Sequence, residues 1–466
     1  MAAVTAPAWA LAQENARPTR GQERPNLVFV FADQWRAQAT GYGGDSNLRT
    51  PHLDELAAES IDFRNAVASC PVCSPYRGSL LTGMYPDQHG VFVNDVHLRD
   101  EFPSIGDQLQ EAGYFTGWIG KWHVNGRGRS AFIPPEERQG FQLWMTMECT
   151  HDYNNSWYYK DTPEKLKWEG YDAFAQTRAA TRFIAEYQED KPFALFLSWG
   201  PPHNPYNTAP AEYRRQFEAA ELVLRGNVPA DHEAAARLDL ADYYAHCAAL
   251  DACLGEIMQA LRAAGLEENT VLVFTSDHGD MLESQGEQRK QRPWDESIRV
   301  PFLLRWPGRF GRSARTIEAP LGTPDLMPTL LELCHASVPD SVQGQSLVPW
   351  LEGAAPEDRG ALIACYTPFG EWTRAKGGRE YRGIRTRRYS YVCDLNGPWL
   401  LYDNDADPFQ LKNLCGAAGQ TDAQTRLDMD LKTLLRELGD EFLPGDEYLR
   451  RWGYKVDATG TVPYKA

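Results

Sequence analysis

Four unbroken apolar runs constrain the fold of this 466-residue chain more than any other feature of its sequence. They lie at Asn26–Ala32, Phe193–Ser198, Thr270–Thr275 and Val300–Trp306. A run of this kind, without polar alternation, is typical of a strand that is buried on both faces, as in a parallel sheet covered by helices. The chain therefore needs a layer of helices on each side of such a sheet.

Amphipathic segments between those runs supply the helices. Ser104–Ala112 begins with a capping serine and ends before Gly113, and apolar residues repeat at three and four positions from Cys247 to Leu261. Strands that alternate with helices predict an α/β core. We expect a large mixed, mostly parallel sheet sandwiched by helices.

The pattern changes after about residue 355. Short runs with partial alternation occupy Tyr381–Arg385, Tyr389–Cys393 and Trp399–Tyr402, and an amphipathic helix is expected over Thr421–Leu438. These segments predict a smaller C-terminal antiparallel sheet plus a helix. The expected parts of the chain are a leader or signal remnant and linker over residues 1–24, a main domain over 25–355, and a C-terminal subdomain over 356–466. The stretch over 124–170 is expected to be a long surface excursion.

Composition excludes several classes of protein. With 47 basic and 64 acidic side chains the net charge is −17, which argues against a nucleic-acid binder, since such proteins usually carry an excess of Lys and Arg. Nine scattered cysteines are too few for a disulfide scaffold. No run of 18 apolar residues exists, so we expect no transmembrane segment.

The first residues resemble the end of a secretory signal. Met1–Gln13 is small and apolar and closes with Ala-Leu-Ala-Gln, although it lacks a basic region. This favours a periplasmic or secreted protein. The alternative is a disordered leader.

Two of the apolar strands end in polar pairs. Asp33-Gln34 follows the first strand, and Asp277-His278 follows the third. The carboxyl ends of parallel strands share one edge of a sheet, so the two pairs could converge there. Two carboxylates, one amide oxygen and one imidazole suit Ca²⁺, or less well Mg²⁺, better than a structural zinc. Either pair alone would be explained as a helix cap, but both together favour a metal site.

The segment from Cys70 to Gly83 is the most informative in the chain. Cys73 precedes Ser74 and Pro75, which we expect to cap and begin a helix, so its side chain would lie at a helix N-terminus that stabilises negative charge. Alternatively, Cys70 and Cys73 form a redox pair or half a zinc site. No second Cys pair is present to support that interpretation.

At this point the sequence resembles the sulfatase family, in which a Cys within Cys-x-Pro-x-Arg-x-x-x-Leu-Thr-Gly is oxidised after translation to formylglycine by a maturation enzyme. The matching residues are Cys73, Pro75, Arg77, Leu81, Thr82 and Gly83. Tyr76 stands where many members carry Ser. The resemblance implies an alkaline-phosphatase-like fold and a sulfuric ester hydrolase.

Further motif pieces follow in the family's order. They are Gly120-Lys121-Trp122-His123, Pro202-His203, and Lys290 with Trp294-Asp295-Glu296-Ser297. Gln285 departs from the family, which often has His there. Outside its motif each residue has an ordinary explanation. Lys290, for example, lies with Arg289 and Arg292 in what could be a solvated basic loop.

The resemblance implies a role for each matched residue. A formylglycine hydrate made from Cys73 would supply one hydroxyl that attacks sulfur and another that later expels sulfate. The implied metal ligands are Asp33, Gln34, Cys73, Asp277 and His278. The other implied catalytic residues are Arg77, Lys121 and Lys290 as charge-neutralising groups, His123 as a base, and His203, with Lys290, as the acid.

The substrate is expected to be a sulfated mono-, oligo- or polysaccharide. Aromatic and polar residues gather over 148–159, a composition suited to sugar faces and hydroxyls, although a packed irregular loop would look similar. The substrate-binding candidates are Asn94, Asp95, Glu148, His151, Arg225 and Asn227. Two other functions remain open: a phosphonate monoester hydrolase or phosphodiesterase of the same superfamily, and a degenerate, non-catalytic saccharide-binding member.

Overall fold

The computed structural model describes residues 24–357 and 359–464, so the predicted signal over Met1–Gln13 lies outside the described residues. An eight-stranded sheet crosses the main domain in the order β11-β2-β10-β9-β1-β8-β4-β5. Its strands are β1 (Asn26–Asp33), β2 (Ile61–Phe63), β4 (Phe115–Lys121), β5 (Leu143–Met147), β8 (Phe193–Pro202), β9 (Thr270–Ser276), β10 (Phe302–Arg305) and β11 (Arg315–Ile317). Only β10 runs antiparallel to its neighbours, so the mixed, mostly parallel sheet is confirmed.

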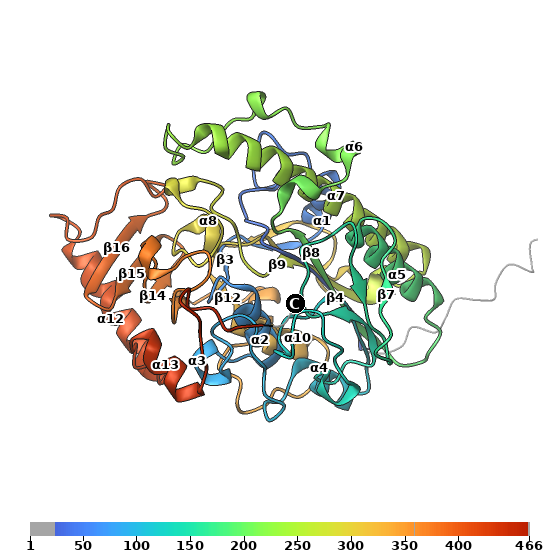
Figure 1. The fold of residues 1–466 in the computed structure, drawn as a ribbon. Helices are drawn as coiled ribbons and strands as arrows, with labels where there is room; N and C mark the ends of the chain where they lie inside the picture. The colour runs from blue at the N-terminus through green and yellow to red at the C-terminus, as the bar shows by residue number, and fades with distance from the viewer. Residues whose placement is uncertain (1–23, 358, 465–466) are drawn as a thin grey trace, which may run out of the picture.

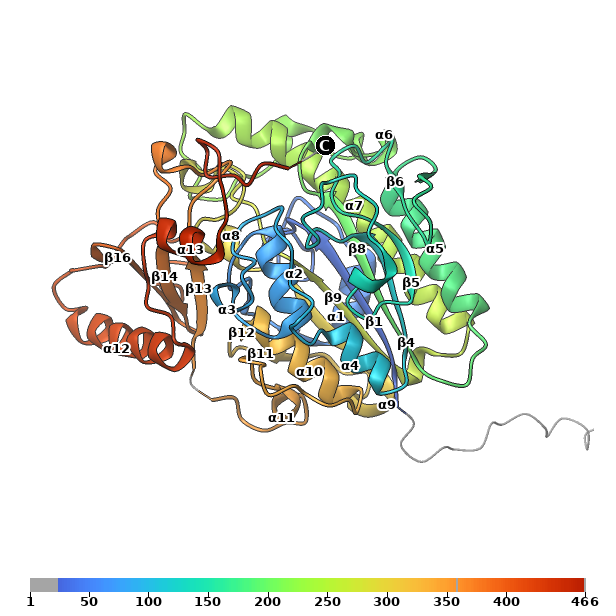
Figure 2. The ribbon, with the colours of Figure 1, turned by 60° about the horizontal axis from the view of Figure 1, so that its bottom comes forward.

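Helices cover both faces of this sheet (Figures 1 and 2). Alternate side chains of β1 face the two layers, since Phe29 joins one core cluster and Val30 the other. The first layer contains α2 (Cys73–Thr82), α4 (Ile105–Glu111) and α10 (Leu326–Leu333). The second contains α1 (Pro51–Ala58), α5 (Asp172–Glu186) and α7 (Glu233–Ala263). Burial on both sides explains why the strand sequences are apolar without alternation.

Shorter elements complete the main domain. They are β3 (Ala66–Val67), α3 (Pro86–His89), β6 (Trp157–Tyr158), β7 (Leu166–Lys167), α6 (Ala211–Arg214), α8 (Asp295–Ile298), α9 (Pro307–Phe310), β12 (Leu321–Gly322) and α11 (Val348–Leu351). Among the described residues, no helix has both the length and the apolar character needed to cross a membrane.

The C-terminal subdomain is a four-stranded antiparallel sheet with a helix on one face, as expected. The strands are β13 (Ala361–Cys365), β14 (Tyr381–Arg385), β15 (Tyr389–Asp394) and β16 (Gly397–Asp403). Leu427, Leu431 and Leu435 of α12 (Thr421–Leu438) pack on this sheet, while its other face meets Val67 and Ile298 of the main domain. A last helix, α13 (Gly445–Trp452), follows.

Three local expectations need correction. The run Val300–Trp306 forms a strand only over Phe302–Arg305. Ser104 does cap α4, in a capping box with Asp107, whereas Ser74 caps nothing. Helix α2 begins two residues earlier than expected, at Cys73 with Val72 as its N-cap, and the Ser74 hydroxyl instead donates to the carbonyl of His123 at 2.6 Å.

The stretch over 124–170 is not a simple surface excursion. It contributes β5, which pairs with β4 at the edge of the main sheet, and a small hairpin of β6 and β7. Glu148 and Tyr153 of this stretch are buried. Its polar and turn residues concealed an edge strand, because strand pairing between distant segments leaves little local signal.

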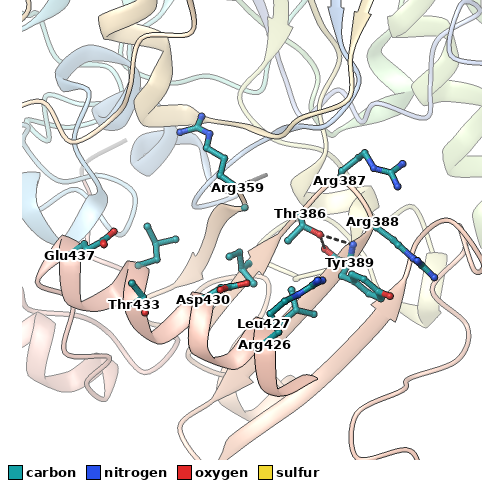
Figure 3. Close-up of a pocket in the computed structure, with 13 residues that line it drawn as sticks. Arg359, Thr386, Arg387, Arg388, Tyr389, Arg426, Leu427, Asp430, Thr433 and Glu437 are labelled. Atoms are coloured by element: carbon teal, nitrogen blue, oxygen red, sulfur yellow. Dashed lines mark hydrogen bonds between the residues drawn. The ribbon is translucent and has the colours of Figure 1, made fainter. Parts of the chain in front are cut away.

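A cavity of about 670 Å³ lies on the C-terminal subdomain, between α12 and the turn joining β14 to β15 (Figure 3). Arg359, Arg387 and Arg388 line it, and each already forms an ion pair with an aspartate. None of its lining residues is among those expected to carry the chemistry.

Candidate active site

Two strand ends and one helix start meet at a single point. In the parallel pairing of β1 with β9, Ala32 lies opposite Ser276, so the following residues Asp33 and Asp277 are neighbours. Cys73 opens α2 above them. One ligand atom from each of Asp33, Cys73, Asp277 and His278 lies within 4.8 Å of the others, and all four residues are buried. We call these four residues the acidic group.

The Cys73 thiol lies at the centre of several charges. Its Sγ is 3.5 Å from Asp33 Oδ1, 3.4 Å from His278 Nε2 and 3.3 Å from Lys290 Nζ. Burial and Asp33 act to raise the pKa of this thiol, but Lys121, Lys290 and His278 bring it well below its ordinary value. The position therefore favours an anionic or electron-rich group.

Two cations neutralise the carboxylates. Lys121 Nζ donates to Asp33 Oδ2 at 2.5 Å, and Arg77 Nη2 lies 3.5 Å from that oxygen and 3.2 Å from Asp277 Oδ2. Arg77 is fixed by the carbonyl of Lys121 and by Ser198 Oγ, each 2.7 Å from Nη1. Burial acts to raise the pKa of Asp33, but Lys121 and other nearby cations hold it well below its usual value.

Gln34 contacts this group through its backbone and Lys290 through its amide oxygen. Its backbone has a φ of 73°, and its N–H donates to Asp277 Oδ1 at 3.1 Å. Its Nε2 donates to Asp280 Oδ2 at 2.6 Å, which leaves Oε1 facing Lys290 Nζ at 3.3 Å. Sequence reasoning missed Asp280, although its place two residues after His278 was a usable signal.

His203 is coupled to Lys290 by a 2.7 Å contact between Nε2 and Nζ. The Nδ1 of His203 lies 2.7 Å from the carbonyl of Asn204, which can only accept, so Nδ1 carries the hydrogen and Nε2 is free to accept from lysine. Burial and Lys290 both lower the pKa of His203. The ring of His151 stacks on that of His203, with centroids 4.5 Å apart.

His123 belongs to a second chain of contacts. Its Nε2 lies 3.3 Å from Asp95 Oδ1. Arg129 donates from Nε and Nη2 to the two carboxylate oxygens of Asp95, at 2.9 Å each. Burial lowers the pKa of His123, but Cys149 and the contact with Asp95 raise it to about 9. Its buried Nδ1 has no partner within the described residues. Sequence reasoning missed Arg129, which lies 34 residues from Asp95.

Two other candidates support the backbone around the site. Asn94 Oδ1 accepts from the N–H of Ser74 at 3.1 Å, in the first turn of α2. Glu148 Oε1 accepts from the N–H groups of Asn125 and Gly126 at 2.6 and 2.8 Å. Burial raises the pKa of Glu148 to about 7.

The last two candidates bind elsewhere. Arg225 and Asn227 donate to the same oxygen of Glu296, at 2.9 and 2.8 Å. Gln285 donates to the carbonyls of Phe409 and Gln410. The contacts of these three residues join the main domain to the segment after β16, and none of them involves the acidic group.

Comparison with protein families gives two matches. A model described as Sulfatase matches residues 25–336, and one described as N-sulphoglucosamine sulphohydrolase, C-terminal, matches residues 286–437. The first covers most of the main domain, including every motif piece named above. The second covers β13 to β16 and most of α12.

Individual proteins agree with these models. The chain is 42% identical, over 92% of its length and 85% of the relative's, to an ulvan-active sulfatase of Formosa agariphila. It is 30% identical, over 90% of its length and 93% of the relative's, to an endo-4-O-sulfatase of Bacteroides thetaiotaomicron. The solved structure of yidJ from Bacteroides fragilis, described as a sulfatase, superimposes with a TM-score of 0.83 at 30% identity, covering 93% of this chain and 99% of that one. The chain belongs to the sulfatase family and is a sulfuric ester hydrolase.

Proposed function

We propose that this chain removes a sulfate ester from a saccharide, using a formylglycine formed at Cys73 and one bound Ca²⁺ ion. Sulfatases generally use formylglycine and a divalent metal. The observation that carries the proposal is the convergence of Asp33, Cys73, Asp277 and His278 within 4.8 Å. The names of the ulvan-active and endo-4-O-sulfatase relatives support a saccharide substrate.

The donor set fits a hard cation. Asp33, Asp277 and the amide of Gln34 offer oxygens, and His278 offers one imidazole nitrogen. Ca²⁺ accepts six to eight oxygen-rich ligands in flexible geometry, whereas Mg²⁺ demands a near-ideal octahedron. When bound, the cation would polarise the sulfate oxygens and stabilise charge that develops on them.

In this proposal Arg77 and Lys121 offset the negative charge of the carboxylates and of the bound sulfate. Both are buried beside Asp33, where a cation interacts far more strongly than in water. Their donors are preorganised, since Arg77 is clamped by Ser198 and by the carbonyl of Lys121. Such fixed cations lower the barrier without reorganising during the reaction.

We assign the proton for the departing sugar oxygen to His203 with Lys290. The 2.7 Å contact between Nε2 and Nζ supports a shared proton at that point, and Nδ1 is held by the carbonyl of Asn204. We assign the base to His123. Asp95 orients its imidazole through Nε2, and the buried Nδ1, which has no partner among the described residues, is the atom that would accept the proton.

Three further expectations stay as proposals. We infer that a formylglycine-generating enzyme acts on Cys73, and that the protein is exported to the periplasm or beyond, as the Met1–Gln13 sequence indicates. We also retain the boundary near residue 355, which precedes β13. Among the substrate-binding candidates, His151 has the best support, because it is partly exposed and stacks on His203.

The test is Cys73→Ser, produced in a host whose maturation system acts only on Cys. We expect turnover of sulfated oligosaccharides to fall below detection while the fold survives, because the nucleophile cannot form. Cys70→Ser is the matched control, since Cys70 is also buried but has its pKa raised to about 12 by burial. Intact mass of the peptide containing Cys73 checks the modification in the wild type. Equal activity of the two variants, or faster cleavage of phosphate than sulfate esters, would refute the proposal.

A further inference from the structure

The C-terminal segment, residues 455–464, returns from α13 to the side of the main sheet where the carboxyl ends of the parallel strands lie. In Figures 1 and 2 it ends near the carboxyl ends of β4 and β8. The segment is anchored along its course. The N–H of Gly370 donates to the carbonyl of Thr459 at 2.9 Å, and Val456 and Val462 pack against the main core. Its position is therefore defined by packing and by hydrogen bonding.

The end of this segment touches the His123 chain of contacts. The Cζ of Arg129 lies 3.6 Å from the centroid of the Tyr464 ring. Arg129 at the same time holds Asp95 with two hydrogen bonds of 2.9 Å, and Asp95 lies 3.3 Å from His123. Three successive contacts thus join Tyr464 to the candidate base.

Tyr464 and Arg129 each have exposed surface that could contact a ligand in addition to the contacts described above. Tyr464 is 44% exposed, and the Arg129 side chain is 21% exposed. Nε and Nη2 of Arg129 are occupied by Asp95, whereas Nη1 has no hydrogen-bond partner within the part of the chain that the structure describes. An exposed aromatic ring beside an available guanidinium donor offers a stacking surface and an anion-binding group together.

We propose that Tyr464 and Arg129 form a subsite for the sugar unit next to the sulfated one, which makes the C-terminal segment a determinant of substrate specificity. This rests on the proposed saccharide sulfatase function. The Tyr464 ring stacks on a sugar face, and Arg129 Nη1 binds an anionic substituent of that unit. The anion is an oxyanion, either a carboxylate or a second sulfate, since both accept from guanidinium in the same way.

The subsite joins recognition to catalysis through Arg129. A guanidinium that binds the substrate with Nη1 keeps Asp95 in place with its other two nitrogens, and Asp95 orients His123. Tyr464 does not contact Asp95 or His123. Its loss is therefore expected to weaken binding of long substrates without altering the chemical groups.

The experiment compares Tyr464→Ala, Tyr464→Phe and Phe310→Ala on ulvan oligosaccharides and on 4-nitrophenyl sulfate. Phe310 is a matched control because its ring also carries an arginine, with Arg309 Cζ at 5.5 Å. Phe310 follows β10. Since β10 runs antiparallel to β9, it leads away from the carboxyl ends of the parallel strands, where the acidic group lies. For Tyr464→Ala we expect KM for the oligosaccharides to rise about 2–10-fold, with little change in kcat, as the loss of one aromatic contact predicts. Tyr464→Phe, which keeps the ring, should retain most of the affinity, and Phe310→Ala should match the wild type.

Direct binding separates this proposal from the proposed function. Calorimetry with fully desulfated ulvan oligosaccharides should show weaker binding by Tyr464→Ala, whether or not the wild type cleaves the sulfated form. Carboxyl-reduced oligosaccharides identify the anion: if reduction weakens wild-type binding, the anion is a carboxylate, and if reduction leaves binding unchanged, it is a second sulfate. Unchanged affinity in Tyr464→Ala, or an equal KM change for 4-nitrophenyl sulfate, would overturn the subsite. Absence of sulfate release by the wild type, with the binding difference intact, would overturn only the proposed function.

Discussion

Arg77 beside the acidic group and Arg382 of the C-terminal sheet are both fully buried, yet their surroundings differ. Every side-chain nitrogen of Arg382 is used, by Asp440, by the Tyr448 hydroxyl and by two backbone carbonyls. Arg77 divides Nη2 between two carboxylates at 3.2 and 3.5 Å, and its Nε has no partner among the described residues. The first arrangement is complete by itself, while the second has capacity left for a ligand.

We expect such a difference between a buried charge that only holds the fold and a buried charge that also binds a ligand. A buried ion pair that only holds a fold needs all its donors and acceptors satisfied, because each unpaired group costs desolvation energy. A site that binds sulfate and a cation has to leave some groups unsatisfied until the ligand arrives. The His123 Nδ1 atom, buried without a partner in the described chain, follows the same rule.

The largest expected effect comes from removing a carboxylate of the acidic group. Asp277→Asn should eliminate measurable sulfatase activity and lower the bound metal, because one charged oxygen ligand is lost. Metal analysis per chain and turnover check this, with chelation followed by Ca²⁺ addition as the reversible test on the wild type. The matched control is Asp440→Asn, whose carboxylate serves Arg382 and which should keep its metal. Full activity in a demonstrably metal-free wild type would contradict the metal assignment, and two zinc ions per chain would favour a phosphatase.

The next effect separates two kinds of substrate. His203→Ala should slow cleavage of sugar sulfates about 10²–10⁴-fold, but cleavage of activated aryl sulfates much less, since a good leaving group needs no proton. Rates on both substrates, measured where sulfate ester cleavage limits turnover, check this. Exposed His335 is the control position, and His335→Ala should behave as the wild type. Equal losses on both substrates would show that His203 is not the acid.

The complete arrangement around Arg382 predicts a loss of stability. Arg382→Met should destabilise the fold by about 3–5 kcal/mol, because Asp440 remains buried without its cation. Denaturant unfolding measures this change, and the acidic group of the folded protein should still catalyse. The double variant Arg382→Met with Asp440→Leu should recover part of the loss. If the single and double variants are equally unstable, pairing with Asp440 does not explain the effect.

Much of the fold could be predicted from the sequence because its signals are local. The apolar runs gave the central strands, and partial alternation gave β14 to β16. Edge strand β5 was missed because its pairing with β4 depends on a distant segment. The same holds at the site. Strand ends and motif spacing predicted Asp33 and Asp277 as site residues. Arg129 and Tyr464 could not be predicted, because their contacts join segments that lie far apart in the sequence.

Within the described chain, Asp172 is a buried carboxylate without a cation beside it, in contrast to the carboxylates paired with Arg77 and Arg382, and this contrast can be tested through the pH dependence of stability. Asp172 accepts from Ser156 Oγ at 3.0 Å, and burial raises its pKa to about 7, whereas Asp33 has cations that lower its pKa. Between the unfolded pKa near 4 and the folded value near 7, the folded state binds more protons than the unfolded state, so stability falls as pH rises. Each pH unit in that window costs about 1.4 kcal/mol at most.

Asp172→Asn removes this titration. Relative to the wild type, the variant should therefore gain stability from pH 5 to pH 7, by about 1–2 kcal/mol in total once solvent relaxation is allowed for, and the gain should level off above pH 7. Thermal unfolding at half-unit pH steps measures it. Glu164→Gln is the control, since Glu164 is exposed and its loss should give a pH-independent difference. A difference between Asp172→Asn and wild type that stays constant with pH would mean that Asp172 is ionised throughout, and that burial without a cation does not control this carboxylate.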